Sequence, residues 1–173
     1  MALCAAAILL AIAERDAHAA GSAAKNTPAA GNAANAARYF MPDAAASKIV
    51  TVAPGGAGGP GIVLVTEAVA VKETGPKATV AHFGEVYAFS PAFLAVHRDA
   101  PVRITLWNLQ PDDEHDFLLE APGGRALMHL RLAPLSKTAY EFTFHREGLF
   151  DYRCAVHQPE MNGQILVLPP ASR

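Results

Sequence analysis

One stretch near the C-terminal end of the sequence decides the fold: Phe150–Leu168, which reads FDYRCAVHQPEMNGQILVL. Phe150, Tyr152 and Cys154 alternate with polar residues, so they share one face of a predicted strand. A loop with Cys-x2-His-x3-Met spacing follows, and Gly163 then opens a second apolar strand. The stretch therefore predicts a chemically dense loop held between two strands of a sheet.

Upstream of this stretch, short apolar or alternating runs are separated by Pro and Gly, a pattern typical of an all-β sandwich or barrel. The predicted strands are 48–53, 62–71, 78–88, 93–96, 102–109, 115–120, 126–132, 138–145, 150–154 and 164–168. Two strands have a clean apolar face, which we expect to point into the core: Val102, Ile104 and Leu106, and Tyr140, Phe142 and Phe144. By the same alternation, His115 shares an inward face with Phe117 and Leu119.

The N-terminal part of the 173-residue chain has a different composition. The apolar run Leu3–Ala13, followed by the small-x-small pattern of Ala17-His18-Ala19, predicts a signal peptide over 1–19. A plain N-terminal helix of the mature protein is the alternative. The run is shorter than the ~20 apolar residues of a membrane span, so we expect no span in the mature chain. Residues 20–47 are predicted to be an Ala-rich, disordered or extended linker, and 48–173 the β-domain.

Composition excludes several classes of function. The formal net charge of -2 argues against nucleic acid as a partner. Two cysteines, Cys4 and Cys154, exclude a disulfide-dense scaffold. The Gly-rich segment 54–61 lacks the Lys-Ser/Thr of a phosphate-binding loop, and no catalytic spacing of another type is present, so we do not expect an enzyme.

The loop after Cys154 indicates a metal site. Cys154, His157 and Met161, with His115 from the upstream strand end, offer a thiolate, two imidazoles and a thioether. This soft set suits copper, because the sulfur ligands favour Cu(I) while the imidazoles tolerate Cu(II). The four residues are therefore candidate ligands of a copper site.

Alternatives to these assignments stay open at the level of sequence. Glu160 is the competitor of Met161 as the weak axial ligand, and softness favours the methionine. Zinc also binds Cys and His, but a structural zinc site calls for more thiolates. The remaining histidines carry no ligand spacing and are assigned structural roles: His82, His97, His129 and His145.

From about Phe89 to Leu168 the chain resembles the cupredoxin family, the small blue copper proteins related to plastocyanin, amicyanin and pseudoazurin. The motifs that carry the resemblance are 89–93 (FSPAF), 102–108 (VRITLWN), 114–117 (EHDF) and 148–157 (GLFDYRCAVH). The resemblance implies a Greek-key β-sandwich in which His115, Cys154, His157 and Met161 bind one copper. The family often has Asn directly after the first ligand histidine, where it ties the two ligand loops together; this chain has Asp116.

The implied function is that of an exported, periplasmic or secreted, type 1 copper protein that carries single electrons between redox partners. A c-type cytochrome or an oxidase is the kind of partner expected. The competing functions are a periplasmic copper chaperone or store, and a red-copper cupredoxin with a carboxylate ligand and a catalytic role. Asp112, Asp113 and Glu114 precede His115, so we also expect an acidic cluster beside the copper that would steer a basic partner.

Overall fold

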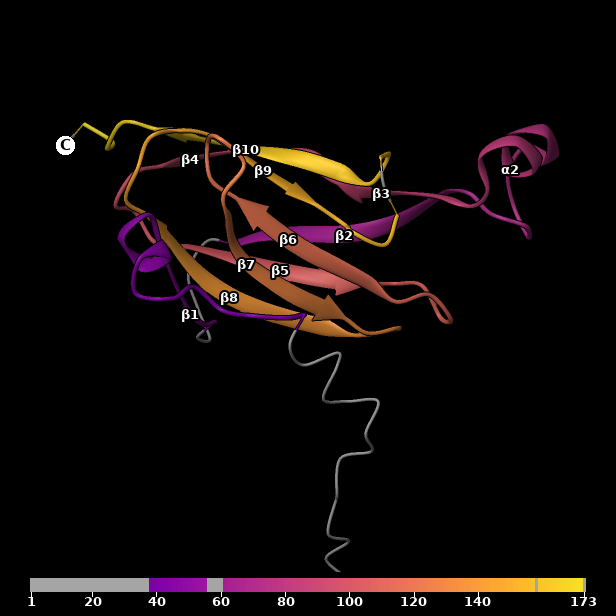
Figure 1. The fold of residues 1–173 in the computed structure, drawn as a ribbon, viewed down its shortest axis with the longest axis horizontal. Helices are drawn as coiled ribbons and strands as arrows, with labels where there is room; N and C mark the ends of the chain where they lie inside the picture. The colour runs from indigo at the N-terminus through magenta and orange to yellow at the C-terminus, as the bar shows by residue number, and fades with distance from the viewer. Residues whose placement is uncertain (1–37, 56–60, 158, 173) are drawn as a thin grey trace, which may run out of the picture.

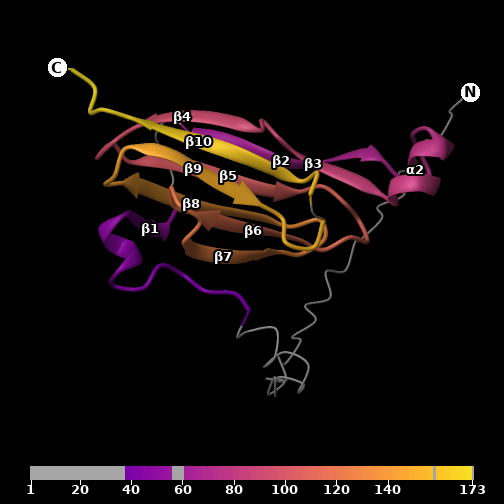
Figure 2. The same ribbon diagram turned by 45° about the horizontal axis from the view of Figure 1, so that its top comes forward.

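The computed structural model describes residues 38–55, 61–157 and 159–172, which form two five-stranded sheets packed face to face (Figures 1 and 2). The first sheet has the order β1 (Val50–Pro54), β8 (Lys137–Phe144), β5 (Val102–Asn108), β2 (Gly61–Ala70) and β3 (Val86–Ser90). The second has the order β4 (Phe93–His97), β10 (Asn162–Leu168), β9 (Gly148–Arg153), β6 (His115–Glu120) and β7 (Ala126–Leu132). The predicted all-β sandwich is confirmed.

The strand order explains how distant motifs meet. β2 pairs in parallel with β5, and β10 in parallel with β4, while the other pairs are antiparallel. Neighbours in each sheet are therefore mostly far apart in the sequence, as in a Greek key. β6 lies beside β9, which brings His115 at the start of one strand near Cys154 just beyond the end of the other.

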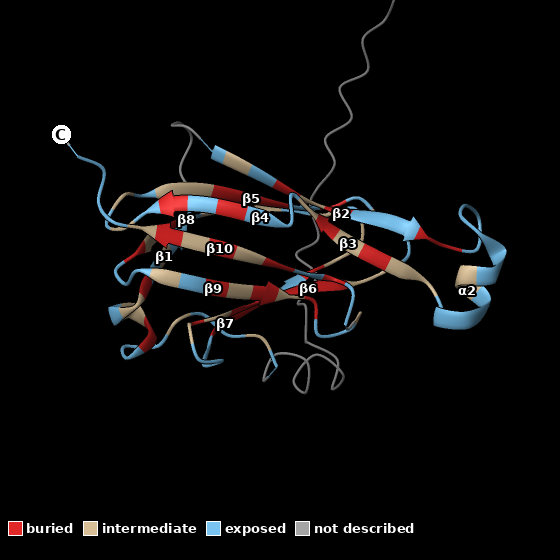
Figure 3. Cartoon of the chain, turned by 90° about the horizontal axis from the view of Figure 1, so that it is seen from above, coloured by how far each residue is buried: buried red, intermediate tan, exposed pale blue. Residues whose placement is uncertain are grey.

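The core lies between the sheets, where buried residues face each other along the inner sides of the strands (Figure 3). The predicted inward faces are confirmed: Ile104, Leu106, Phe142 and Phe144 are fully buried, and Val102 and Tyr140 pack against the core from its edge. Burying such aliphatic and aromatic side chains contributes about 1.5–3 kcal/mol each.

Gly163 is required by this packing. A Cβ at this position would overlap the Tyr152 ring, whose hydroxyl donates a hydrogen bond to the Pro91 carbonyl at 2.7 Å. The glycine that closes the Cys-His-Met loop thus lets β10 pass close to β9.

The prediction of a strand over 78–88 is wrong in its first half. Residues Lys77–Phe83 form a helix, α2, and the strand β3 begins only at Val86. Pro76 stands just before the helix, and Gly84 ends it at φ 81°, donating its N–H to the Val80 carbonyl. Pro before the first turn and Gly after the last are the usual limits of a helix. The helix buries none of its residues and extends from one end of the sandwich (Figure 1).

Residues 38–48, which we call the N-terminal strap, run from β7 at the edge of the second sheet to β1 of the first sheet. Phe40 forms a bridge with His129 of β7 through hydrogen bonds of 2.9 and 2.8 Å, and the 3-10 helix η1 (Ala46–Lys48) leads into β1. The predicted signal peptide and residues 20–37 of the predicted linker lie outside the described residues. Within the described part of the chain, no helix is long and apolar enough to cross a membrane.

Candidate metal centre

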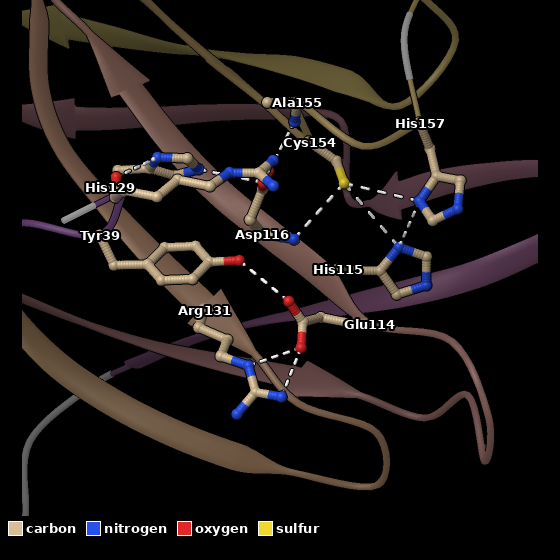
Figure 4. Close-up of polar contacts among 10 residues, drawn as sticks. Tyr39, Glu114, His115, Asp116, His129, Arg131, Cys154, Ala155 and His157 are labelled. Carbon is tan, nitrogen blue, oxygen red and sulfur yellow. Dashed lines mark hydrogen bonds and ion pairs between the residues drawn. The ribbon is translucent and has the colours of Figure 1, made fainter. Parts of the chain in front are cut away.

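Three of the four predicted ligands meet at one end of the sandwich. The Nδ1 atoms of His115 and His157 are 3.0 Å apart, and Cys154 Sγ lies 3.9 Å from the first and 3.6 Å from the second (Figure 4). All three donor atoms lie within 4.8 Å of one another, so they could hold a metal ion together. His115 begins β6, whereas Cys154 and His157 come from the loop after β9.

The backbone of the loop closes on itself and so fixes the two ligands that it carries. The Cys154 N–H donates to the Met161 carbonyl at 2.9 Å, and the Met161 N–H donates to the His157 carbonyl at 3.1 Å. Cys154 is thereby held at the end of the strand face that also buries Phe150 and Tyr152, as its alternation predicted.

On the other side of the centre, Asn108 fixes the segment that leads to His115. Its side-chain amide donates to the carbonyls of Asp113 at 2.8 Å and Leu132 at 3.0 Å. Its side-chain oxygen accepts from the Thr66 hydroxyl and from the Gln110 N–H, both at 2.9 Å. Every hydrogen-bonding position of this fully buried amide is used, so the turn 109–114 has little freedom.

The environment of the three donors favours their neutral forms. Burial, followed by the charge of the neighbouring His157, lowers the pKa of His115 to about 4. Burial likewise lowers the pKa of His157 and raises that of Cys154. Neutral imidazoles keep a lone pair for a metal ion, and a bound cation would take the place of the thiol proton, since metal ligands must be deprotonated.

Tyr87 of β3 was not predicted from the sequence, yet it packs against both imidazoles. Its ring centroid lies 4.8 Å from that of His115 and 4.7 Å from that of His157. The Tyr87 hydroxyl donates a hydrogen bond to Asp113. Only the alternation of β3 could have indicated an inward tyrosine, and nothing local connects it to the ligands.

Asp116, the residue directly after the predicted ligand His115, connects the two ligand loops. Its Oδ1 accepts a hydrogen bond from the Ala155 N–H, and its own N–H donates to Cys154 Sγ at 3.4 Å (Figure 4). The carboxylate therefore ties the two ligand loops together as an amide would. Its Oδ2 lies 2.8 Å from Arg38 and 3.0 Å from His129 Nε2, two residues whose part in the centre the sequence did not reveal.

The two candidate axial residues differ in burial. Met161 is fully buried and Glu160 is exposed. The assignment of Met161 as a ligand stays a prediction. Of the other histidines, His129 is buried beside Asp116 and the strap, His97 bonds the Pro169 carbonyl, and His145 bonds Thr51 and Asp99.

The three acidic residues before His115 have separate surroundings. Glu114 pairs with Arg131 and accepts a hydrogen bond from Tyr39 at 3.0 Å, which together hold its pKa below the usual range. Asp113 is bonded to Tyr87, and Asp112 is exposed. Asp112 and Asp113 also line a hollow of about 570 Å³, and Glu73 and Glu85 line the same hollow.

No protein-family model and no curated protein sequence matches the chain. Among solved structures, auracyanin A is similar with a TM-score of 0.41 and 18% identity, over 47% of this chain and 89% of auracyanin A. It is a blue copper protein from the green thermophilic photosynthetic bacterium Chloroflexus aurantiacus. A reduced Cu(I) form of an amicyanin variant gives a TM-score of 0.44 and 22% identity, over 69% of this chain and 98% of that protein. A multicopper oxidase gives 0.47 and 15%, over 61% of this chain and 43% of the oxidase.

Two five-stranded sheets enclose one core, and a His–Cys–His cluster lies where β6 and the loop after β9 meet at their end. The fold is a β-sandwich with a candidate metal centre at one end. The predicted all-β sandwich is confirmed and three of the four predicted ligands meet, while their role as copper ligands stays a prediction.

Proposed function

We propose that this protein binds one copper ion in a type 1 centre and carries single electrons between redox proteins. The observation that carries the proposal is the convergence of His115, Cys154 and His157, from two separate elements, on one buried point. Two imidazoles and one thiolate form the trigonal set of an electron-transfer copper site. Bound copper would supply the reversible Cu(II)/Cu(I) couple.

The chain itself supports this role by keeping the ligands in place. Hydrogen bonds of Asn108, of Asp116 and within the Cys154–Met161 loop hold the three metal-binding side chains in place. A site whose supporting groups are fixed cannot rearrange when an electron arrives, and little reorganisation favours fast transfer. His157 is only partly buried and its neighbour Val156 is 46% exposed, so we propose that electrons enter and leave at this imidazole.

We propose Met161 as the axial ligand. It follows the two loop ligands, its side chain is fully buried at the same end of the sandwich, and a thioether suits a weak, long axial bond. Glu160 is exposed, which argues against the carboxylate-ligated, catalytic alternative.

The burial of the thiol also separates the carrier from the copper chaperone. A chaperone must pass Cu(I) to another protein and needs sulfur atoms that a partner can reach. Cys154 and Met161 are both 0% exposed. Electron transfer requires only that the partner approach an imidazole edge, so this burial favours the carrier over the chaperone or store, and we propose no enzymatic activity.

The cellular setting belongs to the proposal as well. We propose that residues 1–19 are a signal peptide, that the linker predicted from residue 20 ends before the strap, and that the strap belongs with the copper domain. We also propose that the mature protein is periplasmic or secreted. Its partner would be a redox protein such as a c-type cytochrome or an oxidase.

The test is metal analysis and a visible spectrum of the oxidised protein after loading with copper. We expect one copper per chain and an intense sulfur-to-copper charge-transfer band, which Cys154→Ser abolishes while the fold is retained. His157→Gln should also remove or strongly alter the band, whereas the control His97→Gln, at a surface histidine bonded to the Pro169 carbonyl, should not. A colourless protein that prefers zinc, or an unchanged band in Cys154→Ser, would refute the proposed function.

A further inference from the structure

The N-terminal strap contacts both sequence neighbours of His115. Arg38 places a guanidinium nitrogen 2.8 Å from Asp116 Oδ2. The Tyr39 hydroxyl donates to Glu114 Oε1 at 3.0 Å (Figure 4). Phe40 then joins β7 through its bridge with His129. Arg38 and Tyr39 thus bind the residues on either side of a predicted ligand, and Phe40 fixes the strap to β7.

Asp116 makes the contact with Arg38 important. Its side chain is 0% exposed, and a buried carboxylate is strongly unfavourable unless a cation and hydrogen bonds compensate for the lost water. Arg38 is permanently charged, and its side chain is 41% exposed, so it brings a cation from the surface to the buried group. The His129 ring, fixed by a 2.9 Å contact between its Nδ1 and the Arg38 carbonyl, lies against the same oxygen.

The other polar groups of Asp116 face the metal centre. Its Oδ1 holds the Ala155 N–H, next to Cys154 in the chain, and its backbone N–H donates to the Cys154 sulfur. Ala155, which Asp116 binds, is the residue next to Cys154. A change in the charge or position of the carboxylate should therefore alter the surroundings of the Cys154 sulfur.

We propose that residues 38–40 are a clamp that belongs to the metal centre: Arg38 supplies the countercharge for Asp116, and Tyr39 and Phe40 hold the strap beside His115. The clamp acts through Asp116 and Glu114 and does not touch the metal, so Arg38 is a positioning residue. It lies in the segment that composition assigned to a linker, 78 residues away from its partner.

The sign of the electrostatic effect follows from Coulomb's law. A negative charge near the centre stabilises Cu(II) relative to Cu(I), and a positive charge does the opposite. Removing the Arg38 charge should therefore lower the reduction potential, while removing the Asp116 charge should raise it. The two effects should largely cancel in a protein that lacks both charges. This part of the inference rests on the proposed copper function.

The experiment compares Arg38→Gln, Asp116→Asn and the double variant, with Arg125→Gln as the matched control. Arg125 also faces the strap, 3.7 Å from the exposed Asp43, but has no contact with Asp116. In copper-loaded protein we expect a lower potential in Arg38→Gln, a higher one in Asp116→Asn, an intermediate one in the double variant and no shift in Arg125→Gln. Tyr39→Phe should leave the potential nearly unchanged, because it removes no charge.

A second measurement needs no metal. In metal-free protein, Arg38→Gln should lower the urea midpoint clearly in the wild-type background and little in the Asp116→Asn background, because no buried charge is then left without its partner. Equal potentials for Arg38→Gln and Arg125→Gln, or equal losses of stability in both backgrounds, would overturn the clamp. If wild-type protein lacks the charge-transfer band, the proposed function fails, and the metal-free comparison still decides whether the clamp exists.

Discussion

Replacing Asn108 by leucine tests whether the turn before His115 is fixed by a single buried amide. The substitution keeps the number and branching of the side-chain heavy atoms and removes four side-chain hydrogen bonds of 2.8–3.0 Å. A buried hydrogen bond between neutral groups contributes about 1 kcal/mol net, and each buried partner left unsatisfied costs about 1–3 kcal/mol. We therefore expect Asn108→Leu to lower the free energy of unfolding by about 4 kcal/mol.

The assay is urea unfolding of metal-free protein, with Thr66→Val as a graded control. Thr66 donates one of the four bonds and accepts the Leu109 N–H at 3.2 Å, so its replacement should cost about 1–2 kcal/mol. A typical domain is stable by about 5–15 kcal/mol, so both variants should still fold in the absence of urea. A loss below about 1 kcal/mol for Asn108→Leu, or equal losses in the two variants, would show that the amide does not anchor the turn.

Three further predictions concern the centre and its surface. Met161→Leu should keep the thiolate colour and raise the reduction potential, because loss of a donor disfavours Cu(II), while Glu160→Gln changes little; the reverse pattern in the spectrum and potential would assign a carboxylate ligand. Asp112→Lys combined with Glu73→Lys should slow electron transfer to a basic cytochrome at low ionic strength. The difference in rate from wild type should shrink as added salt screens charges beyond ~10 Å. Equal rates at low salt would show that these carboxylates do not steer the partner. Burial and a carboxylate neighbour raise the pKa of Tyr39 to about 12, above the ordinary ~10, so its contribution to stability is complete below pH ~10 and is lost as pH rises toward 12. Tyr39→Phe should lose less stability in that window, as measured by denaturant midpoints, and identical pH profiles would contradict the assignment.

The second of these predictions departs from the acidic cluster expected from the sequence, for a structural reason. Asp113 bonds Tyr87, whose ring packs on both ligand imidazoles, and Glu114 is paired with Arg131. Changing either residue would disturb the centre as well as the surface. Asp112 and Glu73 are exposed on the same hollow, so they test the charge alone.

Local patterns were sufficient for most of the sheet. Alternation in 102–106 and 140–144, and the inward series Phe150, Tyr152 and Cys154, correctly gave the buried faces. Because the period of a strand is two residues, a cysteine in phase with two core aromatics must point to the core. The helix α2 was missed because its seven residues include Thr79, Val80 and Phe83, which also suit a strand. The decisive signals were at its limits, in Pro76 and Gly84.

The surroundings of the cluster could not be found in this way, because they depend on pairs far apart in the chain. Thr66 and Asn108 are 42 residues apart, Asp116 and Ala155 are 39, and Arg38 and Asp116 are 78. None of these pairs has a spacing that marks it in the sequence. An Ala-rich segment also lacks the periodicity that would indicate packing against a sheet, so Arg38 was read with its neighbours as linker.

The need for a countercharge at Asp116 likewise appears only in the fold. Asp116 alternates with the inward His115 and Phe117, so the sequence places it on the outer face of its strand, yet its side chain is 0% exposed. A carboxylate in that position needs a cation, since an uncompensated buried charge would cost several kcal/mol. Only the fold shows that this carboxylate is buried and identifies its cation as Arg38. It follows that exchanging Asp for Asn at this position alters more than one side chain, because the strap arginine would then lose the charge that it binds.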